Sequence, residues 1–212
     1  MIEWASIILV YAVVYLITAI PFGYYLGLIY GKDLTELGSK SIGATNVLRV
    51  LGKWQAILVL TLDITKGFLP LFLVTNFFWE IIPRESYLFL FLTIVPLIGH
   101  SKSVFIGFKG GKSSATGFGV LLAINPLVAL ITILIWIVTV KVSKYSSLGS
   151  IICIPLVPIW LYLFGEPLNI IIFGIIAFVY IVLIKHSTNM KRLLNGTEPK
   201  VGGQLPNVQV QG

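Results

Sequence analysis

The chain has 212 residues, of which 57% are apolar and 11% are charged, and its mean hydropathy is +0.98. A water-soluble globule of this size needs more polar surface than such a composition provides. The composition therefore excludes a soluble globular protein and predicts one that resides in a lipid bilayer. The single cysteine, Cys153, lies in an apolar run, so neither a disulfide framework nor a cysteine-based metal site is expected.

Six apolar runs are long enough, or nearly long enough, to cross a hydrocarbon core of about 30 Å. The first run has no basic segment before it and is too long for a cleaved signal peptide, so we expect it to remain as an anchor. We expect one membrane domain over residues 1–200 and a mobile tail over 201–212. The runs cover residues 4–29, 54–78, 87–99, 117–140, 147–164 and 168–184.

The segments that connect these runs differ in charge. Residues 30–53, 100–116, 141–146 and the C-terminal part after the last run hold all but two of the 15 basic residues. The N-terminus, the 79–86 loop and the turn at Glu166 carry acidic residues and a single arginine. Because cytoplasmic loops of membrane proteins are enriched in Lys and Arg, the basic segments are placed on the cytoplasmic face.

Six single crossings cannot put all the basic segments on one face, because one pass through 117–140 would invert everything after it. Asn125-Pro126 lies inside this run and is a turn signal that also breaks a helix. We therefore expect a short piece, 117–124, and a fuller helix, 126–140. The short piece covers only about 12 Å and must be shielded by neighbouring helices. A single proline-kinked helix is the alternative.

The predicted fold is thus an all-α polytopic membrane protein with seven transmembrane elements, one of them short. The N-terminus is expected outside and the C-terminus in the cytoplasm, where three polar clusters would meet at one face. This convergence is the main indication of function.

The first cluster covers residues 37–49 and reads LGSKSIGATNVLR. Its small residues let backbone amides approach a ligand, and Ser39, Thr45 and Asn46 offer short neutral hydrogen-bonding groups. Thr45 and Arg49 are four residues apart and would share one face of a helix. Backbone amides combined with one planar cation suit a phosphate group. Taken alone, such a segment between helices is usually an ordinary Gly/Ser loop.

The second cluster is a Gly110-Gly111 turn flanked by Lys109 and Lys112 at the start of an apolar run. A nucleotide P-loop is excluded, because the pattern needs glycine where the sequence has Ile106 and no strand precedes it. The turn amides and the helix dipole both favour an anion, so the turn is interpreted as an anion site. Anchoring on the cytoplasmic face would explain the two lysines but not the glycines between them.

The third cluster, residues 185–198, follows the last apolar run and reads KHSTNMKRLLNGTE. His186, Asn189 and Arg192 are spaced three residues apart, so one helical stripe carries an imidazole, an amide and a guanidinium. Such a stripe can complete an anion pocket, although alone it would be an ordinary basic flank.

Two ionisable residues, Asp63 and Lys66, lie three residues apart inside the second apolar run. Charged groups are costly within a bilayer, and an ion pair between these two is the first expectation. Two interpretations stay open, a pair that serves helix packing and a support for the polar loops.

Together the three clusters resemble, in order and spacing, the three motifs of the acyl-phosphate:glycerol-3-phosphate acyltransferase family. Those motifs commonly read GSGNIGATN, GHxxPxFxxFKGGKGVAT and RHxxNxxRLLxGxE. The resemblance implies a bacterial inner-membrane enzyme that moves a fatty acyl group from acyl phosphate to the 1-hydroxyl of glycerol 3-phosphate. Phosphate and lysophosphatidic acid are released, and no metal, cofactor, acyl-CoA, acyl carrier protein or nucleic acid is expected to take part.

The resemblance also implies roles for individual residues. Acyl phosphate is already activated, so no covalent intermediate is needed, and the substrate's own phosphate would accept the hydroxyl proton while the protein supplies positioning. Fixed cations would stabilise charge on the leaving phosphate. The catalytic positions are Ser39, Arg49, Lys112, His186 and Asn189, and the substrate-binding positions are Thr45, Asn46, His100, Lys109, Gly110, Gly111, Arg192 and Glu198.

The sequence departs from the usual motifs at two places. Lys40-Ser41 stands where the family commonly has Gly-Asn, and Ser113-Ser114 stands where it has Gly-Val. An altered-substrate or noncatalytic relative therefore stays open as an alternative. A transporter of small anions or phosphate esters is the alternative from another class, although it would need more polar groups across the membrane midplane than one ion pair.

Overall fold

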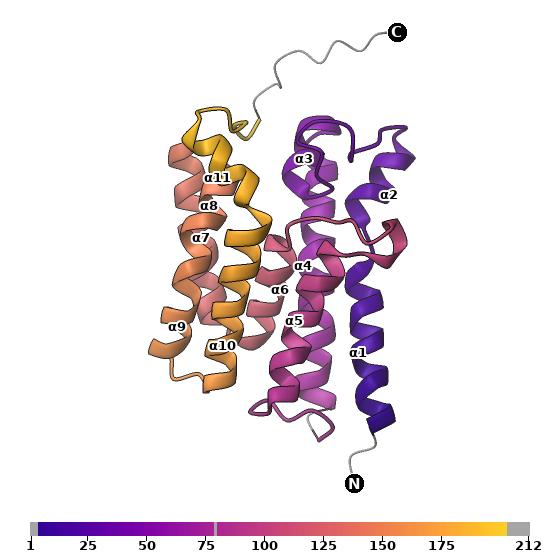
Figure 1. Cartoon of the computed structure of the whole chain (residues 1–212), viewed down its shortest axis with the longest axis vertical. Coiled ribbons are helices and arrows are strands. Elements are labelled where there is room, and N and C mark those ends of the chain that lie inside the picture. Colours follow the sequence, from indigo (N-terminus) through magenta and orange to yellow (C-terminus); the bar gives the residue numbers. More distant parts are fainter. Residues whose placement is uncertain (1–3, 79, 203–212) are drawn as a thin grey trace.

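The structure, a computed structural model, describes residues 4–78 and 80–202, and it is built from helices (Figure 1). A 3₁₀ turn, η1, follows α5, a second, η2, joins α8 to α9, and a π-helical stretch, η3, continues α10. The helices are α1 Trp4–Ala19, α2 Phe22–Ile29, α3 Ala44–Val50, α4 Lys53–Phe77, α5 Tyr87–Ser101, η1 Val104–Ile106, α6 Ser114–Ile124, α7 Pro126–Ser143, α8 Ser146–Cys153, η2 Ile154–Leu156, α9 Val157–Leu163, α10 Leu168–Ala177, η3 Phe178–Lys185 and α11 Ser187–Leu194.

Five helical stretches in the described part of the chain are long and apolar enough to cross a membrane. They confirm the predicted all-helical architecture with several spans, and the apolar helices α5 and α6 are shorter. Many large apolar side chains on these helices are exposed, as expected for surfaces that face lipid. The five stretches are Trp4–Ile29, Lys53–Phe77, Pro126–Ser143, Ser146–Leu163 and Leu168–Lys185.

The predicted break at Asn125-Pro126 is confirmed. Helix α6 ends at Ile124 and α7 begins at Pro126, while the Asn125 side chain accepts a hydrogen bond of 3.0 Å from the Val128 N–H. Proline suits the first position of a helix because its missing N–H would have no partner there. The asparagine cap and the proline together end one helix and start the next.

The chain reverses direction at this break. Arg84 donates to the Ile124 carbonyl at 2.9 Å, and Asn125 donates to Glu166 at 2.8 Å, so the break lies with the loop before α5 and the turn before α10. The other end of α7 meets the C-terminal segment, where the Lys144 carbonyl accepts from the Val201 N–H. The alternative of one kinked helix is therefore wrong.

Helix α6 is enclosed by its neighbours, as its short length requires. None of its residues, Ser114–Ile124, is exposed. It packs against α4 at distances that only glycine permits, since a Cβ on Gly67 would lie 2.2 Å from the Thr116 carbonyl oxygen and one on Gly119 would lie 2.1 Å from that of Ile64. Small residues allow such close approach of membrane helices.

Two features of the helices were not predicted. The apolar run 4–29 breaks at Pro21, which cannot donate a backbone hydrogen bond, and the Ile20 carbonyl at this break accepts from the Lys66 ammonium at 2.7 Å. The last run continues into the π-helix η3 just before the third cluster. π-helical turns are often found at functional sites. The predicted tail, 201–212, lies outside the described residues from 203 onward.

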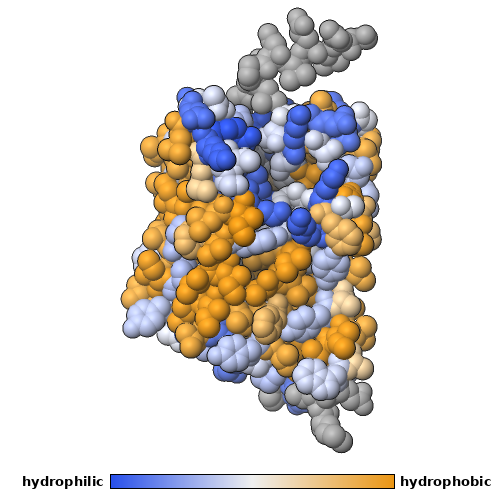
Figure 2. All heavy atoms as spheres, viewed as in Figure 1, coloured by the Kyte–Doolittle hydropathy of each residue, from blue (hydrophilic) through white to orange (hydrophobic). Residues whose placement is uncertain are grey.

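The polar segments gather at one end of the molecule. In Figure 1 the start of α1 lies at the opposite end from α3 and α11, and Figure 2 shows hydrophilic residues around a hollow at the α3 and α11 end, with apolar residues covering the face beyond it. Hydrogen bonds between these segments agree with this view, because Thr45 hydrogen bonds to Ser146, Arg49 to the Pro199 carbonyl, and Lys112 to Asn189.

Candidate functional site

A cavity of about 220 Å³ lies where the three polar clusters meet. Its polar wall comes from the first cluster, the Gly-Gly turn, the start of α8 and helix α11. Its apolar wall comes from α6, α7, η2, α9, α10 and η3. The polar lining includes Ser39, Ser41, Thr45, Asn46, Arg49, Asp63, His100, Lys112, Ser114, Ser146, Ser147, His186, Asn189, Arg192 and Glu198.

Lys112 is carried into the cavity by a turn with unusual backbone geometry. Phe108 and Ser113, which flank the turn, have φ values of 58° and 65°, in the left-handed region. The buried Ser113 hydroxyl donates to the Leu97 carbonyl at 2.7 Å and ties the turn to α5. The Lys112 ammonium then donates to the Asn189 side-chain carbonyl on α11.

The surroundings of Lys112 lower the pKa of its ammonium group. Burial, together with the positive charges of Arg192 and Arg49, lowers the pKa of Lys112 to about 8, although the Glu198 carboxylate acts in the opposite direction. A cation that is partly desolvated and close to two other cations gains strongly from a bound anion. Lys112 is therefore suited to hold a phosphate.

Glu198 organises this side of the cavity. The residue is 8% exposed, and its carboxylate accepts hydrogen bonds of 2.6 Å from both Ser147 and Asn189, while Arg192 donates to it at 2.7 Å. Burial raises the pKa of the Glu198 carboxyl, but the three hydrogen bonds outweigh it and the net shift is downward. Glu198 thus fixes Asn189 and Arg192 in place as a charged carboxylate.

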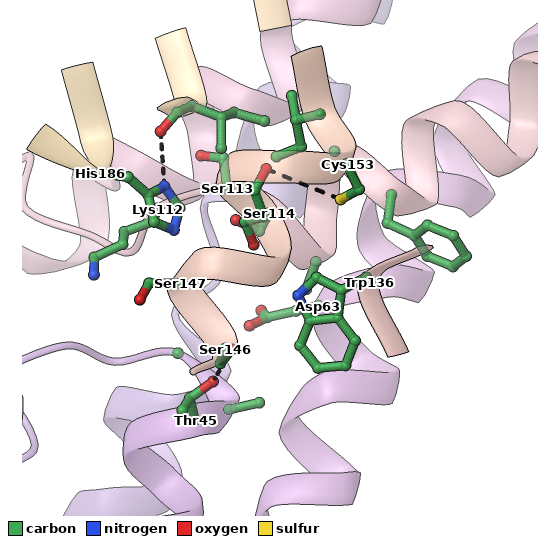
Figure 3. Close-up of a pocket in the computed structure, with 18 of the residues that line it drawn as sticks. Thr45, Asp63, Lys112, Ser113, Ser114, Trp136, Ser146, Ser147, Cys153 and His186 are labelled. Atoms are coloured by element: carbon green, nitrogen blue, oxygen red, sulfur yellow. Dashed lines mark hydrogen bonds between the residues drawn. The ribbon is translucent and has the colours of Figure 1, made fainter. Parts of the chain in front are cut away.

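His186 follows the π-helix directly, and its Nδ1 lies 2.8 Å from the Ile181 carbonyl (Figure 3). Because a carbonyl can only accept, Nδ1 carries the proton and Nε2 is left as an acceptor. Burial and the nearby Lys112 ammonium lower the pKa of His186 to about 4. The imidazole is therefore neutral at physiological pH and a weak base. Figure 3 shows it beside Lys112, facing the same space as Ser147.

Asn46 uses its hydrogen-bonding groups within its own loop. The residue is 1% exposed, and its side chain accepts from the Ser39 N–H at 2.8 Å and donates to the carbonyls of Leu34, Leu37 and Ser41. It therefore shapes the loop that presents Ser39 to the cavity. Nearby, the Thr45 hydroxyl hydrogen bonds to that of Ser146 at 3.0 Å, which joins α3 to α8.

The two arginines of the clusters both line the cavity. Arg49 donates to the Pro199 carbonyl at 3.0 Å, and its buried Nε has no hydrogen-bond partner among the described residues. Burial lowers the pKa of Arg49, yet an arginine stays charged in proteins. Arg49, Lys112 and Arg192 thus bring three cations against the single carboxylate Glu198 at this end of the cavity.

The second cluster is only partly at the cavity. His100 lines it from deep within, close to Asp63, whereas Lys109 is exposed and lies outside its lining. The two glycines pack on His100: a Cβ on Gly110 would lie 2.3 Å from its carbonyl oxygen, and one on Gly111 would lie 2.1 Å from Nε2. The glycines are therefore required by the close approach of the turn to His100.

The residues that depart from the usual motifs adopt the backbone conformation that glycine would favour. Lys40 has φ of 57° and Ser113 has φ of 65°, both left-handed, although neither residue is glycine. A non-glycine residue in this region is strained by about 1–2 kcal/mol. The loop geometry is thus maintained here at some cost in stability.

Sequence reasoning missed the hydroxyls at the start of α8 and the apolar wall. Ser146 and Ser147 begin an apolar run without a surrounding motif, so only their position at the basic end of a span could have pointed to them. Among the described residues no three His, Cys, Asp or Glu side chains gather as a metal site. The apolar lining includes Leu121, Ile133, Trp136, Ile154, Val157, Phe173, Ala177 and Ile181.

The arrangement can hold an amphiphile that carries an anionic head. Cations and hydroxyls surround one end, and the apolar wall continues from there into the membrane region. A hydrocarbon tail gains about 0.8 kcal/mol for each methylene that it buries in such surroundings.

Known proteins share this sequence and fold. Residues 8–196 match the glycerol-3-phosphate acyltransferase family. The glycerol-3-phosphate acyltransferase of Crocosphaera subtropica is 44% identical over 198 residues, which cover 90% of this chain and 92% of that protein. The glycerol-3-phosphate acyltransferase of Desulfotalea psychrophila is 42% identical over 185 residues, which cover 87% of this chain and 92% of that protein.

Solved structures agree with the sequence relatives. A crystal structure of PlsY, an integral membrane glycerol 3-phosphate acyltransferase, in its glycerol 3-phosphate form is 35% identical, with a TM-score of 0.86 over 92% of this chain and 95% of that one. Its lysophosphatidic acid form gives a TM-score of 0.83 over the same shares. This multi-pass membrane protein therefore belongs to the glycerol-3-phosphate acyltransferase family.

Proposed function

We propose that the protein transfers a fatty acyl group from acyl phosphate to the 1-hydroxyl of glycerol 3-phosphate. The observation that carries this proposal is the cavity in which three cations adjoin an apolar wall. Both substrates bring a phosphate, and one of them also brings a hydrocarbon tail. The PlsY structures in glycerol 3-phosphate and lysophosphatidic acid forms support this acceptor and this product.

In the proposed reaction, the 1-hydroxyl oxygen of glycerol 3-phosphate attacks the acyl carbonyl carbon. The bond from that carbon to the phosphate oxygen breaks, the electron pair leaves with phosphate, and the hydroxyl proton passes to phosphate. Lysophosphatidic acid and inorganic phosphate are the products. The reaction balances without a cofactor, because acyl phosphate already contains a good leaving group.

The residues of the cavity fit this chemistry. Lys112 and Arg49 would neutralise the phosphates and stabilise the charge that develops on the leaving group. His186 has a pKa of about 4 and is a poor base at neutral pH, which supports a role in orienting the acceptor through its free Nε2. Holding both substrates in one cavity would supply much of the rate by positioning.

We further propose that the seven apolar elements cross the bacterial inner membrane, with the N-terminus outside and the active site on the cytoplasmic face. The enrichment of basic residues at the cavity end supports this orientation. It would give the site access to water-soluble glycerol 3-phosphate and let an acyl tail enter from the bilayer.

A direct assay tests the proposed function. Purified protein in detergent or lipidic mesophase is given palmitoyl phosphate and glycerol 3-phosphate, and both phosphate release and lysophosphatidic acid are measured. We expect both products from palmitoyl phosphate and neither from palmitoyl-CoA or palmitoyl-acyl carrier protein. No turnover by the wild-type protein would overturn the proposal, and acyl-CoA turnover would overturn the donor.

Matched variants test the site. Lys112→Ala and Arg49→Ala should each lower kcat/KM by about 100-fold or more, since each removes a cation from the phosphates. Lys102→Ala, in the exposed loop before the Gly-Gly turn, should retain the wild-type rate. If both cavity variants keep full activity, the assigned site is wrong although the reaction stands. Phosphate-ester uptake into proteoliposomes without turnover would instead favour a transporter.

A further inference from the structure

We propose that Asp63 is a positioning residue that acts through His100 on the turn carrying Lys112. This inference rests on the proposed function, in which Lys112 holds a substrate phosphate. It assigns a role to the buried charge in α4 that the reaction itself does not use.

Asp63 lies in the middle of α4 and is 2% exposed. Its Oδ1 is 2.9 Å from the Lys66 ammonium and 3.5 Å from His100 Nδ1. His100 is 5% exposed, and neither its Nδ1 nor Asp63 Oδ1 makes a hydrogen bond to any described group. A buried ring nitrogen needs a partner, and the carboxylate oxygen is the group placed to supply it.

The far side of the imidazole meets the Gly-Gly turn. The Gly111 N–H donates to the His100 carbonyl at 3.1 Å, and a Cβ on Gly111 would lie 2.1 Å from Nε2. The ring is therefore held between Asp63 on one edge and the residue before Lys112 on the other. A movement of the ring would move the turn.

Helix α4 is a firm base for this arrangement. Gly67, one turn after Asp63, touches the backbone of Thr116 near the start of α6, so the carboxylate is fixed relative to the end of the turn as well. Lys66 also donates to the Ile20 carbonyl at the break between α1 and α2. One buried cluster thus links α1, α4, α5 and the Lys112 turn.

The consequence for catalysis is geometric. A cation that must meet a phosphate in the transition state loses about 100-fold in rate when it is misplaced by about 1 Å. Asp63 is expected to prevent such a displacement without touching the substrate. The competing interpretation is that Asp63 and Lys66 only pack α4 against its neighbours, in which case their loss affects stability alone.

The first experiment measures kcat/KM for glycerol 3-phosphate in Asp63→Asn, His100→Ala and the double variant, together with the thermal midpoint in detergent. We expect each single variant to lose about 100-fold and the double variant to lose little more, because residues that act as a unit are not additive. His100→Asn keeps a donor close to the Nδ1 position and should retain most of the activity.

The pH profile separates positioning from packing. If Asp63 positions Lys112, the alkaline limb of the kcat/KM profile should shift in Asp63→Asn, because the Lys112 ammonium no longer lies in the same surroundings. A lower thermal midpoint with an unchanged kcat/KM and alkaline limb would overturn the proposal. Losses that multiply in the double variant would overturn it as well.

The contact between Gly111 and the His100 ring can be tested even if Asp63→Asn does not fold, by enlarging one residue and shrinking the other. Gly111→Ala should lower kcat/KM because its Cβ collides with the imidazole. In the double variant, His100→Asn removes the colliding ring atoms, so kcat/KM should be at least about 10-fold higher than in Gly111→Ala alone. Coupled neighbouring residues show effects of this size. Absence of any restoration would overturn the proposal.

Failure of the proposed function would be recognised separately. If the wild-type protein does not turn over palmitoyl phosphate, the same variants are compared by the rise in thermal midpoint that glycerol 3-phosphate produces. A rise in wild type that is reduced in Asp63→Asn and in His100→Ala would support the positioning role. Equal rises in all three proteins would overturn it.

Discussion

The Lys112 ammonium donates a hydrogen bond to the side-chain carbonyl of Asn189, and so joins two clusters that lie 77 residues apart in the sequence. Glu198 accepts from the same asparagine amide at 2.6 Å. A relay from carboxylate to amide to ammonium therefore fixes the cation on the wall of the cavity. The relay explains how the second and third clusters, each unremarkable alone, form one anion site.

The pKa of Lys112 gives a prediction about pH. Because burial and neighbouring cations lower this pKa to about 8, the ammonium loses its proton above about pH 8 in the free enzyme. We expect kcat/KM for glycerol 3-phosphate to fall on the alkaline side with an apparent pKa near this value. Lys112→Arg should move the fall beyond pH 10, even if its maximal rate is lower. A wild-type profile flat to pH 10 would contradict this prediction.

Glu198→Gln tests the carboxylate of the relay. The amide can still accept from Asn189, but it loses the charge that pairs with Arg192 at 2.7 Å. Charge-assisted hydrogen bonds are about twice as strong as neutral ones, so we expect kcat/KM to fall by about 10- to 100-fold. Ser147→Ala removes one neutral donor and should cost less than about 10-fold. Both predictions are checked by measuring kcat/KM of the purified variants at equal concentrations of folded protein.

The matched control lies at the opposite end of the molecule. Glu166 pairs with Arg84 at 2.7 Å, in the same kind of contact but far from the cavity. Glu166→Gln should leave kcat/KM unchanged. If Glu198→Gln behaves like this control, the relay does not contribute to the site.

Much of the fold could be predicted because its signals are local. The break at Asn125-Pro126 combines a capping side chain with a residue that cannot continue a helix, and the charge pattern required a reversal there. At Pro21 the charge pattern does not require the chain to reverse. Lys66, which donates to the Ile20 carbonyl at this break, lies 46 residues away in the sequence. A proline alone is tolerated within a membrane helix, so the segment by itself does not decide whether the helix breaks there.

The site was predictable to the level of its clusters but not of its side chains. Lys109 and Lys112 look equivalent on either side of the two glycines, yet only Lys112 lines the cavity. The left-handed φ values at Phe108 and Ser113 set the path of the turn. These residue types do not predict a left-handed conformation. Asn46 matches a binding motif, but its polar groups are used by its own loop.

Lys40 provides a prediction about stability. It is exposed with φ of 57°, and glycine there would remove the left-handed strain. Lys40→Gly should stabilise the protein by about 0.5–1 kcal/mol after the entropy cost of glycine, seen as a higher thermal midpoint at unchanged activity. Lys141→Gly, at an exposed helical position, should instead destabilise by about 1 kcal/mol. A lower midpoint for Lys40→Gly would show that the strain is absent.

Labelling of single cysteines tests the proposed orientation. Lys191 and Glu85 are both exposed and lie at opposite ends of the molecule. In a Cys153→Ala background, an impermeant maleimide added to intact bacteria should label Glu85→Cys, whereas Lys191→Cys should react only after the cells are permeabilised. The reverse pattern would place the cavity end outside, against the excess of basic residues there.

The apolar wall of the cavity leads to a prediction about the acyl tail. Ala177 is buried on α10 and lines the cavity, where a larger side chain would occupy space that the tail needs. Ala177→Leu should lower kcat/KM for palmitoyl phosphate by about 10-fold or more, and affect octanoyl phosphate much less. Ile175→Phe enlarges an exposed side chain of the same helix and should leave the ratio of the two rates unchanged. If Ala177→Leu lowers both rates equally, the tail takes another path out of the polar site.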